Sequence, residues 1–200
     1  MTLIALGAFF GILAGVIQAL AYLDYNQLVL RGKLRPNGST WLIWAPLAAL
    51  NAATYFFTSD DWAKTFLSLV NTALCIGTLA IALIGKRFDK MDAWEIVALI
   101  VGLSSTLFWY YYRSAMYANF VLQIAIAIGF IPTYRMVWHR PQKERIRPWL
   151  LWTLAYAVLI LAVVLRWRGQ WQDMVYPVSM LVLHPAVAGL ILIRAKKLSC

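Results

Sequence analysis

Apolar residues fill seven long stretches of the chain, and short polar or charged segments separate them. Each stretch is close to the length of about 20 residues that a helix needs to cross the apolar core of a bilayer. Strands of a membrane barrel would be about half as long and would alternate between apolar and polar positions. Because backbone groups in lipid must find their hydrogen bonds within the protein, this pattern predicts an all-α membrane protein with seven transmembrane helices. The predicted helices cover residues 3–28, 40–57, 63–85, 93–112, 115–138, 149–165 and 174–193.

A weak internal repeat relates the two halves of the chain. A shift of 108 positions places Trp41 on Trp149 and Trp44 on Trp152. The same shift matches the first three predicted helices with the last three, and leaves the fourth unmatched. Two copies separated by one helix have the same orientation in the membrane, as in parallel-repeat transporters. We therefore expect a 3+1+3 arrangement: a first three-helix bundle in residues 1–87, a linker helix in 88–113, and a second bundle with a short basic tail in 114–200.

Composition and charge agree with a membrane location. The chain is 62% hydrophobic and 13% charged, whereas soluble domains are about half apolar and a quarter charged. Of its 18 lysines and arginines, 14 lie in the first, third and fifth loops and in the tail. The positive-inside rule then predicts an outside N-terminus and a cytoplasmic C-terminus. The first stretch is too long, and lacks the basic start, for a cleaved signal peptide.

The net charge of +10 is explained by these loops, which face lipid headgroups, so we expect contact with membrane lipid and no nucleic-acid partner. The short loops favour the bacterial inner membrane.

Polar and aromatic residues form stripes on several predicted helices. Amides, phenols and indoles on one face of an apolar helix suit either a ligand cavity or hydrogen bonds between helices. If they form a cavity, its candidate substrate-binding residues are Trp44, Asn51, Tyr55 and Asn71 in the first half and Asn119, Gln123, Trp152, Tyr156 and Ser179 in the second.

Two ionisable side chains lie within predicted spans and are candidates for proton coupling. Asp24 is the acid that we expect to be most buried, although it could instead pair with Arg31 or Arg35 of its own loop. His184 is a lone histidine within a span, where packing is the commoner role. Prolines can kink such helices, and the candidate hinges are Pro132, Pro177 and Pro185.

Other residues have structural explanations. Trp41 is expected to anchor the helix at the membrane interface. The acidic loop 58–61 and the pair Asp92 and Glu95 are expected to cap the helices that follow them. One face of the first helix carries small residues suited to close packing, namely Gly7, Gly11 and Gly15.

The loop that leads into the second predicted helix reads Pro-Asn-x-x-Thr-Trp-x-x-Trp at residues 36–44. With the 3+1+3 arrangement and the outside N-terminus, the chain resembles the SWEET and PQ-loop superfamily, closest to its small bacterial seven-helix members. The superfamily's Pro-Gln pair appears here as Asp24-Tyr25 in one copy and Pro132-Thr133 in the other. The asparagine of the third helix is Asn71.

The resemblance implies a small-molecule transporter, either a uniporter or proton-coupled, with a central site between the bundles for a small polar or ring-containing solute. The alternatives are a receptor or binding protein, or a structural membrane protein, on the same scaffold. No metal-binding motif, clustered acidic set or nucleophile with a base is evident, so we expect no enzyme activity, no catalytic residues, no cofactor and no metal. Assembly into a homo-oligomer stays open.

Overall fold

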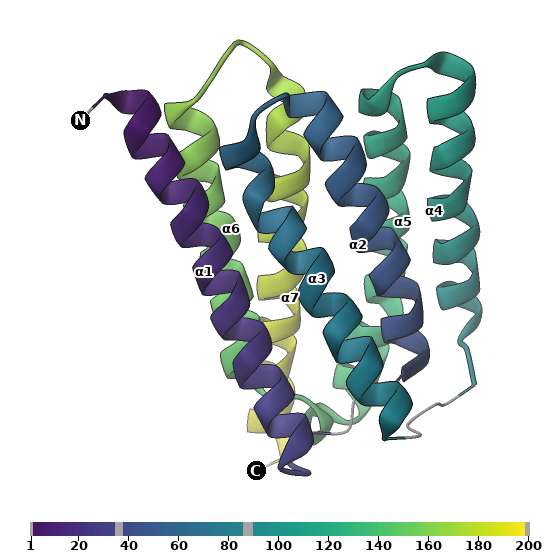
Figure 1. Cartoon of the computed structure of the whole chain (residues 1–200). Coiled ribbons are helices and arrows are strands. Elements are labelled where there is room, and N and C mark those ends of the chain that lie inside the picture. The colour runs from purple at the N-terminus through teal and green to yellow at the C-terminus, as the bar shows by residue number, and fades with distance from the viewer. Residues whose placement is uncertain (1, 35–37, 86–89, 199–200) are drawn as a thin grey trace.

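The computed structural model describes residues 2–34, 38–85 and 90–198 (Figure 1). This part of the chain contains seven α-helices and no strand, so the predicted all-α fold is confirmed. The helices are α1 (Leu3–Leu30), α2 (Gly38–Ser59), α3 (Trp62–Ile84), α4 (Ala93–Tyr112), α5 (Ala115–His139), α6 (Ile146–Leu165) and α7 (Val175–Leu198). Short 3-10 helices, η1 (Pro141–Lys143) and η2 (Trp171–Met174), precede α6 and α7. The helix ends lie within a few residues of the predicted ends.

Within the described residues, six helical segments are long and apolar enough to cross a membrane, which is compatible with an integral membrane protein. They are α1, α3, α4, α5, α6 and the segment Trp171–Lys196, which contains α7. The remaining helix, α2, carries Trp44, Pro46, Asn51 and Tyr55, and these residues lower its hydropathy. Asn51 and Tyr55 are nonetheless buried within the protein.

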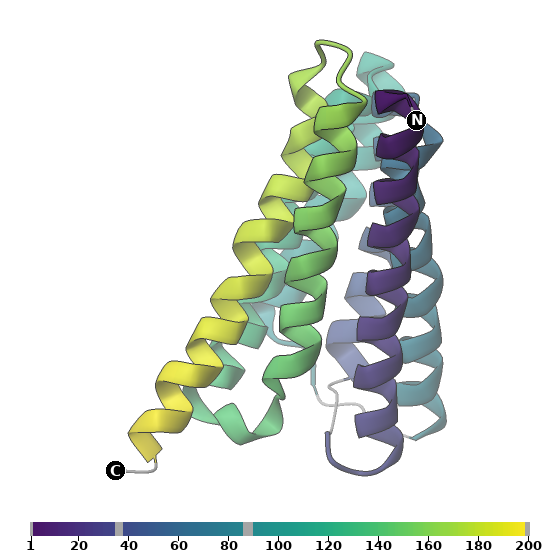
Figure 2. The same ribbon diagram turned by 90° about the vertical axis from the view of Figure 1, so that its left-hand side faces the viewer.

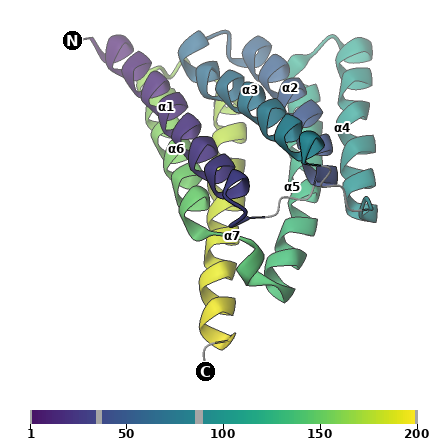
Figure 3. The same ribbon diagram turned by 60° about the horizontal axis from the view of Figure 1, so that its bottom comes forward.

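Six helices form a closed ring. Going round the ring, α1 packs on α3, α3 on α2, α2 on α5, α5 on α7, α7 on α6, and α6 on α1. The fourth helix stands outside the ring, against α5 and α2, as Figures 1 and 3 show. The arrangement gives every ring helix one face toward a common interior, while α4 covers the outside.

The two ends of the ring are packed differently. At the end that holds the N-terminus, α1 and α6 lie close together, and they diverge toward the end that holds the C-terminus (Figure 2). Gly11 allows the close approach of α1 to α3, because a Cβ atom there would lie 2.2 Å from the backbone oxygen of Ala63. The three glycines of this face, Gly7, Gly11 and Gly15, are all buried, as their spacing predicts.

The predicted caps are present. Asp61 is the N-cap of α3, and its side chain accepts a hydrogen bond from the backbone N–H of Ala63. Asp92 and Glu95 form a capping box at the start of α4, in which each side chain bonds the backbone near the other residue. These contacts satisfy N–H groups that would otherwise lack partners in the first helical turn.

The prediction that Trp41 is an interfacial anchor is wrong. Its side chain is only 4% exposed, and its ring packs against Tyr22, Tyr25 and Trp44 inside the ring of helices. Sequence reasoning placed it at the interface because it lies one turn into its helix, but the interior of the ring extends that far. By contrast, Tyr110, Tyr111 and Tyr112 at the end of α4 are exposed aromatic residues.

Candidate functional site

The ring of helices encloses a central cavity of about 60 Å³. Its wall includes residues from all six ring helices and none from α4. Among the described residues that line it there is no lysine, arginine, aspartate or glutamate, so the cavity is uncharged apart from one histidine. The lining residues are Tyr22, Trp44, Leu47, Ala48, Asn51, Asn71, Cys75, Ile126, Phe130, Trp152, Tyr156, Tyr176, Met180 and His184.

Five of the nine residues predicted to bind substrate line this cavity. They are Trp44, Asn51, Asn71, Trp152 and Tyr156. The polar stripes of both halves therefore converge on one cavity. The roles of these residues in binding stay predictions.

The other four predicted residues lie outside the cavity wall. Asn119 and Gln123 are buried behind it and donate hydrogen bonds to Asn51 Oδ1 at 3.3 and 2.7 Å. Tyr55 donates to the backbone oxygen of Asp173 at 2.8 Å. The hydroxyl of Ser179 is bonded within its own helix, to the Val175 backbone oxygen at 2.7 Å. Two of these residues hold a lining amide in place, and the other two fix helix ends.

Several polar groups of the cavity already have partners. Asn71 Oδ1 accepts hydrogen bonds from Gln18 Nε2 at 2.7 Å and from the Tyr22 hydroxyl at 3.0 Å. The hydroxyls of Tyr156 and Tyr176 lie 3.0 Å apart. These bonds connect α1 with α3 and α6 with α7, so they also hold the helices together.

One buried donor in the cavity wall has no partner. The indole Nε1 of Trp152 is buried and makes no hydrogen bond within the described structure. A buried polar group without a partner costs about 1–3 kcal/mol, so such groups are few in folded proteins and often mark a site. His184 lies beside it, with ring centroids 5.9 Å apart, and one of its ring nitrogens bonds the Met180 backbone oxygen at 3.0 Å.

A second, larger cavity opens at the C-terminal end of the ring. This vestibule has a volume of about 460 Å³ and is lined by residues of α1, α2, α4, α5 and η1 and by Trp149 of α6. Trp44 lines both cavities, so its indole is part of the wall between them.

Four aromatic rings build this wall. We call Trp44, Phe130, Trp149 and Trp152 the aromatic layer. The ring centroids of Trp44 and Phe130 are 5.0 Å apart, and those of Trp149 and Trp152 are also 5.0 Å apart. Trp149 contacts both members of the first pair, at 6.5 Å from Trp44 and 6.2 Å from Phe130. Trp44 lines both cavities, Trp149 lines the vestibule, and Phe130 and Trp152 line the central cavity, so the aromatic layer lies where the two cavities meet.

A buried carboxyl is bonded to the aromatic layer from the vestibule side. Glu144 lies in the loop between η1 and α6 and is 7% exposed. Its Oε2 accepts a hydrogen bond of 3.0 Å from Trp149 Nε1. Burial raises the pKa of the Glu144 carboxyl to about 7, although hydrogen bonds from the Trp149 indole and the Arg145 backbone favour its ionised form.

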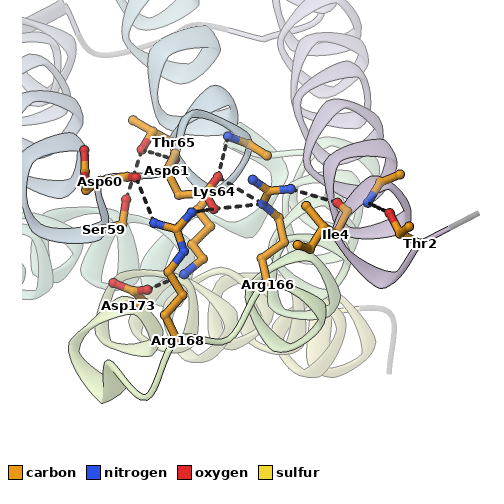
Figure 4. A network of polar contacts seen from close by, with 12 residues as sticks. Thr2, Ile4, Ser59, Asp60, Asp61, Lys64, Thr65, Arg166, Arg168 and Asp173 are labelled. Atoms are coloured by element: carbon orange, nitrogen blue, oxygen red, sulfur yellow. Dashed lines mark hydrogen bonds and ion pairs between the residues drawn. The ribbon is translucent and has the colours of Figure 1, made fainter.

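The opposite end of the ring is closed by ion pairs, shown in Figure 4. We call Asp61, Lys64, Arg166 and Asp173 the ion-pair cluster. Lys64 Nζ lies 2.5 Å from Asp173 Oδ2, and both side chains are fully buried. Arg166 Nε lies 2.8 Å from Asp61 Oδ2 and its guanidinium also donates to the backbone oxygen of Ile4. The cluster ties the start of α3 to the end of α6 and to η2.

The two candidates for proton coupling differ in their surroundings. Asp24 is not the most buried acid, because Asp61, Glu95 and Asp173 are each at most 3% exposed whereas the Asp24 side chain is 18% exposed. It pairs with Arg147 of α6 at 3.6 Å. Of the partners expected from its own loop, Arg35 lies outside the described residues. His184, by contrast, lines the central cavity.

The predicted hinge prolines occupy two kinds of position. Pro132 and Pro185 lie inside α5 and α7, where a missing N–H interrupts the helical hydrogen bonds. Pro177 lies in the first turn of α7, where no helical bond is lost. The sequence analysis missed Pro46, which lies inside α2 between the cavity-lining residues Trp44 and Asn51.

The sequence analysis also missed Glu144 and the pair of Lys64 and Asp173. Both basic and acidic residues of these sites lie in or next to predicted loops, where charged side chains are usually exposed. The partners are far apart in the chain, since Lys64 and Asp173 are separated by 109 positions. The 108-residue shift aligns Lys64 with Gln172, next to Asp173, but equivalent positions in two copies need not lie in contact. No sequence signal therefore pointed to the pair.

Comparisons of the chain with models of protein families, with curated proteins and with solved structures gave no match.

Proposed function

We propose that this protein is a seven-span membrane transporter of the SWEET/PQ-loop type, and that its central cavity is the site for a small, neutral, polar solute. The observation that carries the proposal is the cavity itself. Its described lining contains no lysine, arginine, aspartate or glutamate, it is lined from all six ring helices, and its wall contains an unpartnered indole N–H. Ligand sites in proteins are mostly apolar and aromatic spaces with a few placed polar groups.

The pattern of helix contacts supports a 3+1+3 repeat. Within the first three helices, α3 packs on both α1 and α2, and within the last three, α7 packs on both α5 and α6. Between the two sets, α1 packs on α6 and α2 packs on α5. Exchanging each helix with its partner in the 108-residue shift leaves this list of contacts unchanged. On this reading, α4 links the sets and takes no part in the cavity, and all seven helices cross the membrane.

The distribution of charge supports an outside N-terminus. The vestibule end carries the basic loops, with Lys90, Arg135, Arg140 and Lys143 among its lining residues. Basic residues accumulate on the cytoplasmic side of membrane proteins. The vestibule then opens toward the cytoplasm, in a bacterial inner membrane, and the ion-pair cluster closes the outer end.

The cavity dimensions indicate that the structure is a closed form. Sites for small ligands usually have volumes of about 300–1,000 Å³, and this cavity of about 60 Å³ holds only a few water molecules. A solute therefore enters only after helices of the two sets move apart at one end. Trp152 would donate its free N–H to a solute oxygen, and Trp44 and Tyr156 would pack on a ring.

A structural role is the second candidate, and the paired amides favour it. Asn51 with Gln123, and Asn71 with Gln18, satisfy one another without any solute. Such pairs contribute about 0.6 kcal/mol each in membrane proteins, which makes them useful for holding helices together.

A thermal-shift screen separates the two candidates. The purified protein is heated in detergent with neutral sugars, polyols, nucleosides and amides, and a solute at 100 times its Kd stabilises the fold by about 2.7 kcal/mol. Trp152→Phe keeps an aromatic ring, smaller than the indole, and removes the free N–H, so it should abolish the shift. Ser179→Ala, outside the cavity wall, is the matched control and should keep it. No shift with any solute, together with normal folding of both variants, would support the structural role.

A further inference from the structure

The contact between Glu144 and Trp149 connects a titratable group with the wall of the central cavity. The carboxyl is bonded to the indole at 3.0 Å, and Trp149 in turn packs on Trp152 and Trp44, which both line that cavity. Glu144 itself lines the vestibule. A change in the charge of Glu144 therefore acts directly on a hydrogen bond to the aromatic layer.

The neighbouring acidic and phenolic groups do not compete for Trp149. Asp92 pairs with Arg135 at 3.4 Å, and Glu95 accepts hydrogen bonds from the Thr40 hydroxyl and from the start of its own helix. Tyr25 of α1 faces Glu144 across the vestibule and interacts with it electrostatically. Asp92 and Glu95 are therefore engaged with other partners, and the Trp149 indole donates to Glu144.

Bases also surround the vestibule mouth, but solvent screens most of them. Arg194 of α7 donates to the Trp138 backbone oxygen at 2.8 Å and packs on its ring, so it is held away. The side chains of most others are exposed, and exposed charges interact weakly through water. The bases on the elements packed round Glu144 are Lys90, Arg135, His139, Arg140, Lys143, Arg145, Arg147, Arg194 and Lys196, of which Arg135 and Arg147 pair with Asp92 and Asp24.

The direction of the effect follows from linkage. In the closed form the carboxyl is buried, and its pKa of about 7 is higher than the usual 4.5. A carboxyl that moved into the open vestibule would regain hydration, and its pKa would return toward the usual value. The closed form therefore binds the proton more tightly than an open form, so protonation favours closure and ionisation favours opening.

We propose that Glu144 is a proton-binding residue that controls the aromatic layer. With the carboxyl neutral, its carbonyl oxygen keeps the Trp149 indole in place and the layer stays closed. Ionisation draws the carboxylate into the water of the vestibule, Trp149 follows, and the vestibule connects with the central cavity. The inference rests on the proposed function only in taking this passage as the route of the solute.

Cys75 provides a readout that needs no substrate. Its thiol is 1% exposed and lies in the wall of the central cavity. The chain has one other cysteine, Cys200, and the change Cys200→Ser leaves Cys75 as the single thiol. Methyl methanethiosulfonate converts a thiolate to a mixed disulfide and releases methanesulfinate. The rate of this reaction, followed by intact mass between pH 5.5 and 8.5, reports access to the cavity.

The informative quantity is the ratio of rates in the Cys200→Ser background and in the same background with Glu144→Gln. The ratio cancels the effect of pH on the thiol itself. Because glutamine cannot ionise, the ratio should rise by about threefold or more between pH 5.5 and 8.5, with half of the rise reached near pH 7. His139→Gln, at the same vestibule, is the matched control and should behave as the background does.

A second variant tests the link through the indole. Trp149→Phe removes the N–H that favours the ionised carboxylate, so the midpoint should move to higher pH. Equal rates with and without Glu144→Gln across the whole range would overturn the proposal, as would a pH dependence lost in His139→Gln instead. A solute screen without hits would leave these rates unaffected, so failure of the transport assignment is distinguishable from failure of this inference.

Discussion

The two ends of the central cavity are closed by different chemistry. At the N-terminal end, two acids and two bases pair with one another across the start of α3, the end of α6 and η2. At the C-terminal end, uncharged rings form the aromatic layer. The carboxyl of Glu144 accepts a hydrogen bond from one of these rings, the Trp149 indole. The first closure keeps its charges neutralised in pairs, whereas the second depends on whether one group is protonated.

This difference indicates which end responds to conditions. Breaking a buried ion pair leaves two charges without partners, so the N-terminal end is costly to open unless something replaces the partners. A carboxyl whose pKa lies near neutral pH changes its charge with a small change in proton concentration. The end with the ion-pair cluster should therefore set the stability of the fold, and the vestibule end should set its pH dependence.

The largest expected effect comes from removing one charge of the ion-pair cluster. Lys64→Met leaves the fully buried Asp173 without its partner, which should lower the free energy of unfolding by about 3–5 kcal/mol. Unfolding of the detergent-solubilised protein, followed by circular dichroism, measures the loss. The double change Lys64→Met with Asp173→Leu should recover most of it, and a double variant as unstable as the single one would contradict this explanation.

A smaller effect, but one that depends on pH, is expected at the vestibule end. The pKa of Glu144 is raised from 4.5 to about 7, so its contribution to the free energy of unfolding is fully present below pH 4.5 and is lost as the pH rises through 7. The loss amounts to about 3 kcal/mol. Glu144→Gln should therefore become more stable relative to the wild type across this window, as thermal unfolding at several pH values would measure. His139→Gln should show no such trend.

The packing of α1 on α3, close to the ion-pair cluster, can also be tested. Gly11→Ala places a Cβ atom 2.2 Å from the Ala63 backbone oxygen, so α1 must move away from α3. Overpacking of this kind costs about 1–3 kcal/mol. Gly189→Ala is the matched control, since no atom lies within 4 Å of its added Cβ. A similar melting temperature for the two variants would show that α1 is less tightly held than the structure indicates.

The smallest expected effect is the loss of one hydrogen bond. Tyr55→Phe removes the bond from the Tyr55 hydroxyl to the Asp173 backbone oxygen while keeping the ring in contact with Tyr176. The free energy of unfolding should fall by about 1 kcal/mol at every pH. A loss of stability that grew with pH would mean that the end with the ion-pair cluster titrates as well, and the contrast between the two ends would then be weakened.

The sequence predicted the helices well because each is a long apolar stretch, and some begin at a recognisable cap. Asp61 and the Asp92–Glu95 box could be identified from neighbouring residues alone, and both are present. Trp44, Asn51 and Trp152 could be found because helical periodicity places polar and aromatic side chains on one face.

What the sequence could not provide was the depth of a residue in the assembled ring. Trp41 looked interfacial and is buried, whereas Asp24 looked buried and is partly exposed. The burial of Glu144 depends on the packing of η1 against α5 and α7, and that of Lys64 on η2. Such environments arise from segments far apart in the chain, so local pattern does not reveal them.

The closed ring of six helices also has a consequence for the bilayer. Each ring helix packs on a neighbour at both sides, and α4 stands against the outside of α2 and α5. In a bilayer, a molecule dissolved among the acyl chains would therefore have to pass between two packed helices to reach the central cavity. The pair to watch is α1 and α6, which diverge toward the end that holds the C-terminus (Figure 2).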